Sequence, residues 1–358
     1  MIVTISQATL SGALATVAKA VSKTADHPIL AGVLMVAEGG TLEMRTCGDA
    51  SVRAMCQAIV EEDGATVLPA AVMARAVKGM RDGAVTIEST KGAATVRCGR
   101  TTFRLNALDP ADFPDFPEVD GATEATIPGA AFCSMVGMAA RASGDMPGRP
   151  LLAGVHVSLS AGRLTMTATD SYRAAICSTE VDVDAELSAV IPARTLQEVA
   201  AASDGRDVTV VVGDRQARLS VCGTTFVTRV LEGRYPDVSM MMPKSSKTEV
   251  TVDAVEMADA VRRASLVGSK SVILTAGGDE VLVEASSPDK GEAREPVSAD
   301  VEGEAVRISL ADRFLLDGLT ATDGELMIGL DGSMQPAVMR AWGDVAFEYL
   351  LMPMRIQP

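Results

Sequence analysis

The chain has 358 residues, of which 47% are hydrophobic and 22% charged, and its formal net charge is -15 at pH 7. This length exceeds what a single hydrophobic core usually serves, so it predicts two or three domains, and the composition excludes a wholly disordered chain. An acidic protein repels polyanions, which disfavours binding to nucleic acid that depends on neutralising many phosphates.

The first elements predicted along the chain are a helix, a strand pair, a second helix and a second strand pair. Apolar residues between positions 10 and 21 recur at helical spacing, and Gly39-Gly40 marks the turn between two strands. In the second helix the predicted apolar side contains Val72, Ala76 and Met80. Each such unit places helices on a mostly antiparallel sheet, which predicts an α+β fold.

The same succession of elements occurs twice more along the chain. The stretch VLPAAVMARAVKGMRDGAVTI is matched by VIPARTLQEVAAASDGRDVTV, and a fainter third copy runs from TVDAVEMADAVRRASLVG to AWGDVAFEYLLMP. Internal repeats of this kind indicate copies of one structural unit. We therefore predict three tandem similar domains, at residues 1–121, 122–243 and 244–358.

No pattern in the chain indicates catalysis or metal binding. The six cysteines include no Cys-x-x-Cys pair, and His27 and His156 occupy nonequivalent positions of two repeats. The chain contains neither a phosphate-binding loop nor a dinucleotide fingerprint after a strand, and Asp170 in ATDSYR is as readily a turn residue as a catalyst. We expect no catalytic residue, no cofactor and no metal site.

The beginning of the chain also bears on its location. The stretch MIVTISQATLSGALATVAKAVSK has no basic leader followed by a long apolar core, and no window approaches the roughly 18 apolar residues that a membrane span needs. We expect a cytoplasmic protein without a membrane partner.

Five motifs occur in the order, and at about the spacing, of one known family. They are HPILAGVLM, LDPADFPDFP, TATDSYRAAICS, LEGRYPDVSMMMPK and YLLMPMR. On these motifs the chain resembles the bacterial DNA polymerase III sliding clamps, the beta subunits. The resemblance implies a homodimeric ring with helices lining its inside and antiparallel sheets outside. Such a ring encircles duplex DNA as a non-catalytic processivity factor.

The resemblance also implies partners. They are duplex DNA bound without sequence preference, a clamp loader, the catalytic subunit of the replicative DNA polymerase, DNA repair polymerases, mismatch repair proteins and ligase. A ring linked topologically to DNA needs few phosphate contacts, so the acidic net charge does not conflict with this function.

A further implication is a groove between the second and third domains that receives partner peptides. Apolar anchors and flexible methionines suit such binding. The groove residues carried over by motif are Leu152, Thr169, Tyr172, Arg173, Ala174, Pro236, Met240, Met241, Leu350, Leu351, Met352, Pro353, Met354 and Arg355. Ser171 and Ala174 replace the more usual glycine and leucine, so we expect a different anchor preference. Without the resemblance, YLLMPM is better explained as a plain core strand.

Two more sets of residues follow from the resemblance. The DNA-facing residues are Lys23, Arg75, Lys78, Arg141, Arg149 and Arg194, although a solvated helix face explains any one of them about as well. The dimer interface joins Phe103 and Leu105 of one subunit to Leu266 and Val267 of the other. A peptide-binding repeat scaffold that does not encircle DNA is the alternative, because a fold does not determine a function.

Overall fold

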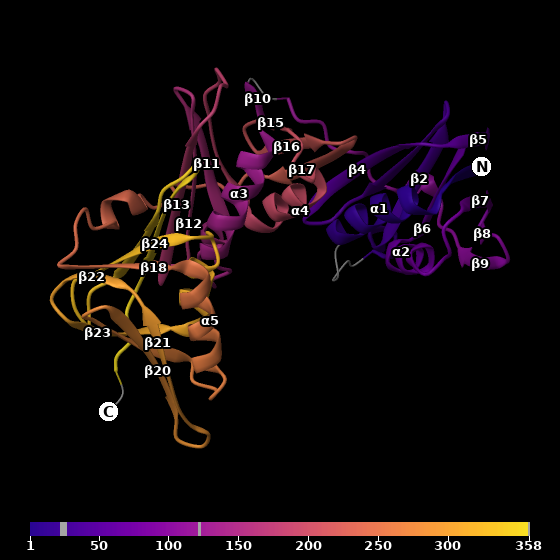
Figure 1. Cartoon of the computed structure of the whole chain (residues 1–358). Helices are drawn as coiled ribbons and strands as arrows, with labels where there is room; N and C mark the ends of the chain where they lie inside the picture. Colours follow the sequence, from indigo (N-terminus) through magenta and orange to yellow (C-terminus); the bar gives the residue numbers. More distant parts are fainter. Residues whose placement is uncertain (22–26, 121–122, 357–358) are drawn as a thin grey trace. The chain divides into compact units, whose positions relative to one another are not determined.

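The computed structural model describes residues 1–21, 27–120 and 123–356. The chain forms two compact units, one of residues 1–129 and 198–230 and the other of residues 130–197 and 231–358. Figure 1 shows helices packed on antiparallel sheets in each unit, and the predicted α+β class is confirmed. The domain boundaries after residues 121 and 243 stay a prediction, because the units group strands by contact and not by repeat.

The first unit is built on two antiparallel sheets. The five-stranded sheet has the order β5-β1-β7-β8-β9, with β1 (Ile2–Ser6), β5 (Ile59–Glu62), β7 (Ala84–Thr90), β8 (Ala93–Cys98) and β9 (Thr101–Asn106). The eight-stranded sheet has the order β10-β15-β16-β17-β4-β3-β2-β6. Its strands are β2 (Gly32–Glu38), β3 (Thr41–Thr46), β4 (Ala50–Gln57), β6 (Gly64–Pro69), β10 (Thr123–Ile127), β15 (Val208–Val212), β16 (Gln216–Val221) and β17 (Thr224–Arg229). The helical segments are α1 (Gln7–Val17), η1 (Ala18–Ala20), η2 (Pro28–Ala31), α2 (Ala70–Lys78) and η3 (Pro110–Asp112).

The second unit also contains two antiparallel sheets. The nine-stranded sheet has the order β14-β11-β12-β13-β26-β25-β24-β18-β22. Its strands are β11 (Gly154–Ser160), β12 (Arg163–Thr169), β13 (Arg173–Glu180), β14 (Leu187–Pro192), β18 (Thr248–Asp253), β22 (Asp300–Gly303), β24 (Glu325–Leu330), β25 (Ala337–Ala341) and β26 (Ala346–Leu351). The four-stranded sheet has the order β21-β20-β19-β23, with β19 (Ser271–Gly277), β20 (Glu280–Ser287), β21 (Gly291–Ser298) and β23 (Val306–Ala311).

The remaining helical segments belong to the second and third repeats. They are α3 (Gly129–Ala139), η4 (Ala140–Ala142), η5 (Pro150–Ala153), α4 (Ala193–Ser203), η6 (Val238–Met241), α5 (Ala254–Ser265) and α6 (Asp312–Leu319). Among the described residues, no helix has the length and apolar character required to cross a membrane.

Local sequence explains where the helices begin and which side they bury. Ser6 caps α1 by accepting a hydrogen bond from the backbone N–H of Thr9 at 3.1 Å, and Leu10, Leu14 and Val17 are fully buried. The helix ends at Val17, before the end of the predicted apolar stripe.

In α2 one predicted apolar position is wrong. Val72 is exposed and Met73 is buried in its place. The remaining predicted positions, Ala76 and Met80, are buried as expected, so the apolar stripe includes Met73, which lies three residues before Ala76 on the same side of the helix.

Each large sheet joins strands of two different repeats. In the first unit β17 pairs with β4, and Phe226 lies opposite Val52. In the second unit β13 pairs with the terminal strand β26, and Ala175 lies opposite Tyr349. Backbone hydrogen bonds thus make neighbouring repeats into one sheet, which explains why an apolar strand occurs so near the end of the chain.

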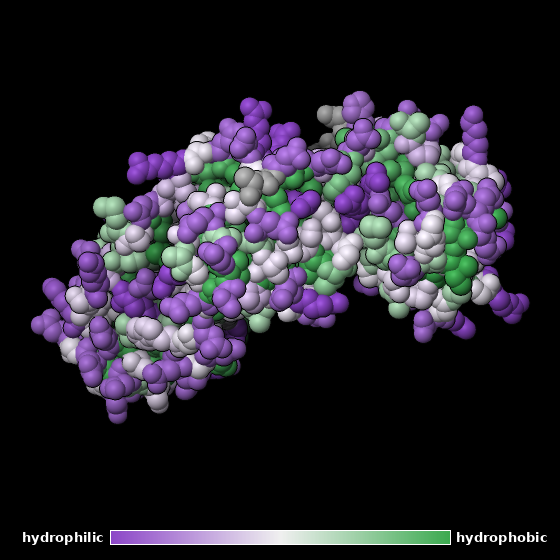
Figure 2. Space-filling model, turned by 90° about the horizontal axis from the view of Figure 1, so that it is seen from above, coloured by the Kyte–Doolittle hydropathy of each residue, from purple (hydrophilic) through white to green (hydrophobic). Residues whose placement is uncertain are grey.

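The face of the molecule drawn in Figure 2 carries many polar residues. Apolar residues appear there in small, separate areas, and scattered apolar residues on a surface are normal in folded proteins. An exposed cluster of large apolar side chains is therefore informative wherever it occurs.

Candidate functional site

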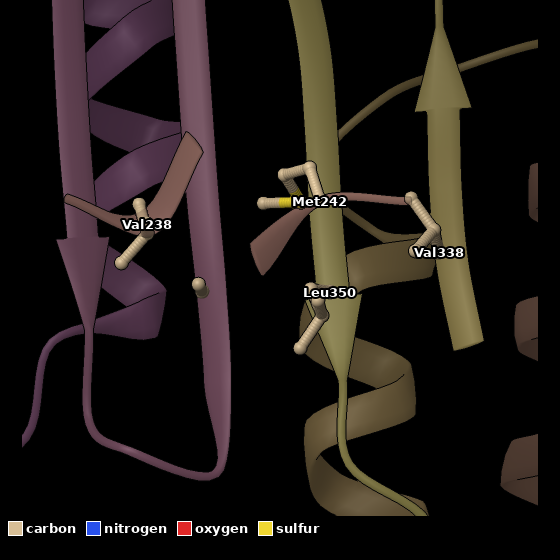
Figure 3. Packing of buried hydrophobic residues seen from close by; sticks show 5 residues of the cluster. Val238, Met242, Val338 and Leu350 are labelled. Carbon is tan, nitrogen blue, oxygen red and sulfur yellow. The ribbon is translucent and has the colours of Figure 1, made fainter. Parts of the chain in front are cut away.

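The junction of β13 and β26 carries a small apolar cluster on one face of the nine-stranded sheet. Leu350 of β26 lies opposite both Ala174 of β13 and Val338 of β25 in the strand register. Val238, the first residue of the 3₁₀ turn η6, and Met242, which follows the turn, pack on these three side chains, and all five are buried (Figure 3). Strand alternation places Leu351 on the opposite face of the sheet from Leu350.

The turn η6 presents its middle residues to solvent. The Asp237 carboxylate accepts hydrogen bonds from the backbone N–H of Ser239 at 3.2 Å and from its hydroxyl at 2.6 Å, which holds the turn in shape. Because Val238 and Met242 are buried on either side, Met240 and Met241 project outward, with 84% and 56% of their surface exposed.

The terminal segment follows Leu350, which packs on this turn through Val238 and Met242. The N–H of Met352 donates to the carbonyl of Tyr172 at 2.9 Å, and the N–H of Met354 donates to the carbonyl of Ser309 at 2.8 Å. Ser309 belongs to β23, an edge strand, so the terminal segment covers part of that edge. The side chains of Tyr172, Met352 and Met354 are exposed.

One residue of this surface was missed by the sequence reasoning. Met334 is 57% exposed in the loop before β25, and the pairing of Ala337 with Leu351 brings that loop beside the terminal segment. It lies in the faintest repeat, where only its apolar character could have drawn attention to it. We define the methionine patch as Met240, Met241, Met334, Met352 and Met354.

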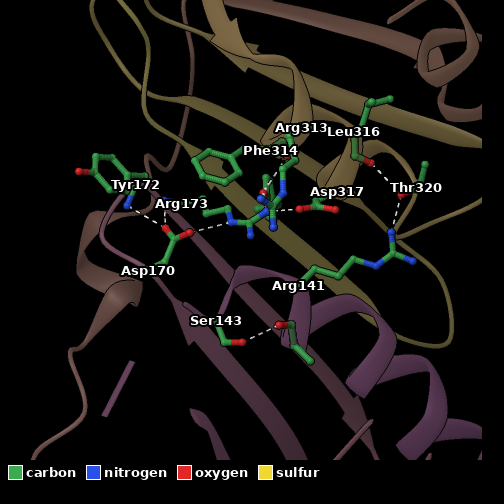
Figure 4. Close-up of polar contacts among 12 residues, drawn as sticks. Arg141, Ser143, Asp170, Tyr172, Arg173, Arg313, Phe314, Leu316, Asp317 and Thr320 are labelled. Carbon is green, nitrogen blue, oxygen red and sulfur yellow. Dashed lines mark hydrogen bonds and ion pairs between the residues drawn. The ribbon is translucent and has the colours of Figure 1, made fainter. Parts of the chain in front are cut away.

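Behind the patch lies a buried ion network around Arg173 (Figure 4). Its Nε donates to Asp170 at 3.0 Å, its Nη1 donates to Asp317 of α6 and to the Tyr349 hydroxyl, and its guanidinium lies 4.2 Å from the centre of the Phe314 ring. Burial by itself would lower the pKa of Arg173, but Tyr349, Asp317 and Asp170 raise it above its ordinary value. The charge is satisfied internally and ties β13 to the third repeat.

Asp170 is a turn residue. Its carboxylate accepts hydrogen bonds from the N–H groups of Tyr172 at 2.9 Å and Arg173 at 3.0 Å. Ser171, between Asp170 and Tyr172, has a φ of 76°, a left-handed conformation that favours glycine. These bonds fix the backbone that carries Tyr172 to the surface.

The other predicted groove residues are distributed around this turn. Leu152 is buried, and its carbonyl accepts from the N–H of Gly144 at 3.0 Å. The N–H of Thr169 donates to the Tyr235 hydroxyl at 3.1 Å, and the carbonyl of Pro236 accepts from Val238. The structure thus brings together most of the predicted set, while Leu351 lies in the core on the other face.

The sequence was compared with models of known protein families, and three of them match it in succession. Residues 1–117 match the N-terminal domain of the DNA polymerase III beta subunit, residues 126–237 its central domain, and residues 239–355 its C-terminal domain. The chain belongs to the DNA polymerase III beta subunit family.

Relatives of this family are similar over nearly the whole length. The beta sliding clamps of Streptomyces coelicolor and Bacillus subtilis are each 29% identical, over 97% and 95% of both chains respectively. The crystal structure of the Bacillus subtilis clamp is 28% identical with a TM-score of 0.90 and full coverage of both chains. A Pseudomonas aeruginosa clamp bound to griselimycin is 24% identical, with a TM-score of 0.89, over 99% of this chain and all of that one.

Membership of the beta subunit family confirms several predictions. The family resemblance and the three tandem domains are confirmed. Beta subunits are non-catalytic processivity factors that work with DNA and DNA polymerase III, so the predictions of a processivity function and of no enzymatic activity are confirmed as well.

The residues that the beta subunit resemblance assigns to DNA occupy varied surroundings. Lys23 lies outside the described residues. Arg75 and Lys78 are exposed on α2, and Arg194 is exposed on α4. Arg141 donates to the carbonyl of Gly137 at 2.9 Å and to the Thr320 hydroxyl of the third repeat, and Arg149 donates to the Ser171 hydroxyl at 3.1 Å. Arg141 therefore has a structural contact in addition to any contact with DNA.

The residues predicted at the dimer interface of this beta subunit lie on one edge strand and at the end of one helix. Phe103 and Leu105 are on β9, which ends the five-stranded sheet, and β21 ends the four-stranded sheet. Leu266 is 81% exposed at the C-terminal end of α5, and Val267 follows it. Helix α5 packs on β20 and β21, as Figure 1 shows.

Proposed function

We propose that this chain acts as a ring that encircles duplex DNA and tethers the catalytic subunit of DNA polymerase III. The methionine patch is the observation that carries the tethering part of this proposal. A monomeric protein rarely leaves several large apolar side chains exposed together unless a partner covers them. The part that concerns encircling DNA is supported by the match of nearly the whole chain to a family of processivity factors.

The ligand of the patch is an extended peptide with two or three apolar anchors. Each anchor gains about 1.5–3 kcal/mol on burial, and methionine side chains adapt to different anchor shapes. This permits one surface to serve the polymerase, the clamp loader, repair polymerases, mismatch repair proteins and ligase in turn. The griselimycin complex of the Pseudomonas aeruginosa relative supports a ligand-binding surface in the family.

The ring forms by antiparallel pairing of β9 in one subunit with β21 in another. Among the described residues each strand has a neighbour on one side only, and an unpaired edge is a template for pairing with another chain. Exposed Phe103 and Leu266 would be covered, and Arg104 of β9 and Glu292 of β21 are opposite in charge. Two such joints close a ring, as expected for a symmetric dimer.

DNA contacts in this proposal are few and come from exposed basic side chains, among them Arg75, Lys78, Arg149 and Arg194. A ring closed around the duplex stays on DNA without a high affinity for the phosphates, so the net charge of -15 is compatible with function. The protein acts in the cytoplasm, where these partners work in bacteria.

The experiment that tests the ring is loading onto nicked circular DNA with the clamp loader of the same organism. The protein should remain on the circle through gel filtration and leave when one restriction cut makes it linear. A peptide-binding scaffold that does not encircle DNA would show the same retention before and after the cut, and that result would overturn the proposal. Scattering on an absolute scale should give a mass of 2 × 37.1 = 74.2 kDa.

A further inference from the structure

Most of the exposed thioether side chains belong to the second unit. Six methionines are exposed among the described residues, and five of them form the methionine patch. The sixth, Met55 on β4, belongs to the first unit. The patch is therefore the principal target for reagents that attack exposed methionine sulfur.

Within the patch, Met240 is the most exposed side chain, at 84%, and its neighbour Met241 is 56% exposed on the same turn. The flanking residues Val238 and Met242 are buried in the apolar cluster (Figure 3), and the Asp237 carboxylate holds the backbone of the turn. The two side chains cannot both retreat into the cluster without displacing buried residues. Their sulfur atoms stay in solvent until a ligand covers them.

We propose that Met240 and Met241 are sulfoxidation sites through which a peroxide weakens peptide binding to the methionine patch, an inference that rests on the proposed peptide-binding function. The sulfur lone pair attacks one oxygen of hydrogen peroxide, an S–O bond forms and the O–O bond breaks. The leaving hydroxide takes the proton from the transferred oxygen. One sulfoxide and one water result, and the two electrons lost by sulfur reduce the peroxide.

The chemical change acts directly on binding. A sulfoxide is polar and strongly hydrated, whereas the thioether is apolar and flexible. An anchor that covers the sulfoxide removes its water without supplying a hydrogen-bond donor, which is unfavourable. We expect peptide affinity to fall about tenfold or more, and methionine sulfoxide reductase to restore it.

The test uses the full chain and a dye-labelled peptide. The peptide is the clamp-binding segment of the replicative polymerase of the same organism, with any methionine or cysteine replaced. Fluorescence anisotropy is measured before and after hydrogen peroxide, followed by a thiol reductant that reverses cysteine oxidation but not methionine sulfoxide. Mass spectrometry counts the sulfoxides at each methionine.

Two variants make the result specific. The peroxide dose is limited so that mass spectrometry finds sulfoxide at Met240 and Met241 of the parent but not at Met334, Met352 or Met354. At that dose a Met240→Leu/Met241→Leu double variant should keep its own untreated affinity to within about twofold, because leucine cannot be oxidised. Met55→Leu is the matched control, since Met55 is 50% exposed but outside the patch, and it should lose affinity as the parent does. Bound peptide should protect Met240 and Met241 from oxidation and leave Met55 unprotected.

The outcomes separate the two proposals. Equal losses in the double variant and the parent, or unchanged affinity of the oxidised parent, would overturn the inference and leave the peptide-binding function intact. A parent that binds no peptide before treatment would remove both.

Discussion

At the scale of single residues, the site depends on the buried positive charge of Arg173, which is paired within the protein and does not face a ligand. Arg173 belongs to the set predicted to line a peptide groove, yet its guanidinium is buried among Asp170, Asp317 and Tyr349. The sequence could suggest that Arg173 matters but not what it contacts, because Asp317 is far away along the chain. Its evident task is to hold the surface turn at Tyr172 against the third repeat.

Replacing this arginine should therefore be costly. Arg173→Met leaves the buried Asp170 carboxylate without its cation, and breaking a buried pair destabilises by roughly 3–5 kcal/mol. Urea unfolding should show the loss. Arg294→Met is the matched control, since Arg294 pairs with Glu284 while 67% of its side chain is exposed, and it should cost at most about 1 kcal/mol. Equal losses in the two variants would contradict the assignment.

His156 makes stability depend on pH. Its Nε2 lies 2.9 Å from the Ser188 hydroxyl, and burial lowers the pKa of His156 below its ordinary value. The unfolded chain binds the proton more readily, so the stability contributed by neutral His156 is present above about pH 6.5 and is lost as pH falls through the lowered folded pKa. Thermal melting between about pH 7.5 and pH 5 should show a smaller decrease for His156→Gln. An identical decrease in both proteins would refute this role.

At the scale of elements, the terminal strand combines two tasks. Strand β26 closes the nine-stranded sheet between β13 and β25, and the residues after it continue along the edge of β23 and carry part of the methionine patch. A core strand and a binding surface are therefore not alternatives for YLLMPM. The two interpretations apply to alternate faces and successive residues of one segment.

Deleting residues 352–358 should abolish peptide binding, because it removes Met352 and Met354 and uncovers the β23 edge at Ser309. The sheet keeps β26, so folding and dimer formation should persist, as circular dichroism and scattering would show. Deleting residues 356–358 is the control, since it leaves the Met354–Ser309 bridge. Undiminished peptide affinity in the longer deletion would count against the patch.

The exposed end of α5 should control association. Leu266→Asp places a charge in the proposed joint, where burying an unpaired charge is unfavourable. The scattering mass should fall from 74.2 kDa to the 37.1 kDa of one chain. Val255→Asp provides the comparison, because Val255 is also exposed on α5 but at its N-terminal end. It should stay dimeric, and a dimeric Leu266→Asp protein would move the joint elsewhere.

At the scale of the whole molecule, an acidic chain is suited to DNA if a closed ring around the duplex holds it there, because electrostatic attraction to the phosphates is weak. A protein held by 6–10 phosphate contacts loses about 10³–10⁵ in affinity between 50 and 200 mM salt. Retention of the loaded protein on nicked circular DNA should change less than about twofold over that range. Linear DNA is the control and should retain none. A steep salt dependence on the circle would indicate electrostatic binding.

The sequence by itself determined the threefold repeat, the α+β class and the family, because periodicity, turn residues and motif order are local properties of the chain. It did not reveal that α2 buries Met73 in place of Val72, since both residues lie at helical spacing from the buried Ala76. Only the tertiary structure decided which side chains meet at the site. Ala174 and Leu350 share one face because β13 and β26 pair in one register, and Arg173 reaches Asp317 because that pairing brings α6 within reach. Such contacts follow from strand pairing between distant segments, which no local pattern encodes.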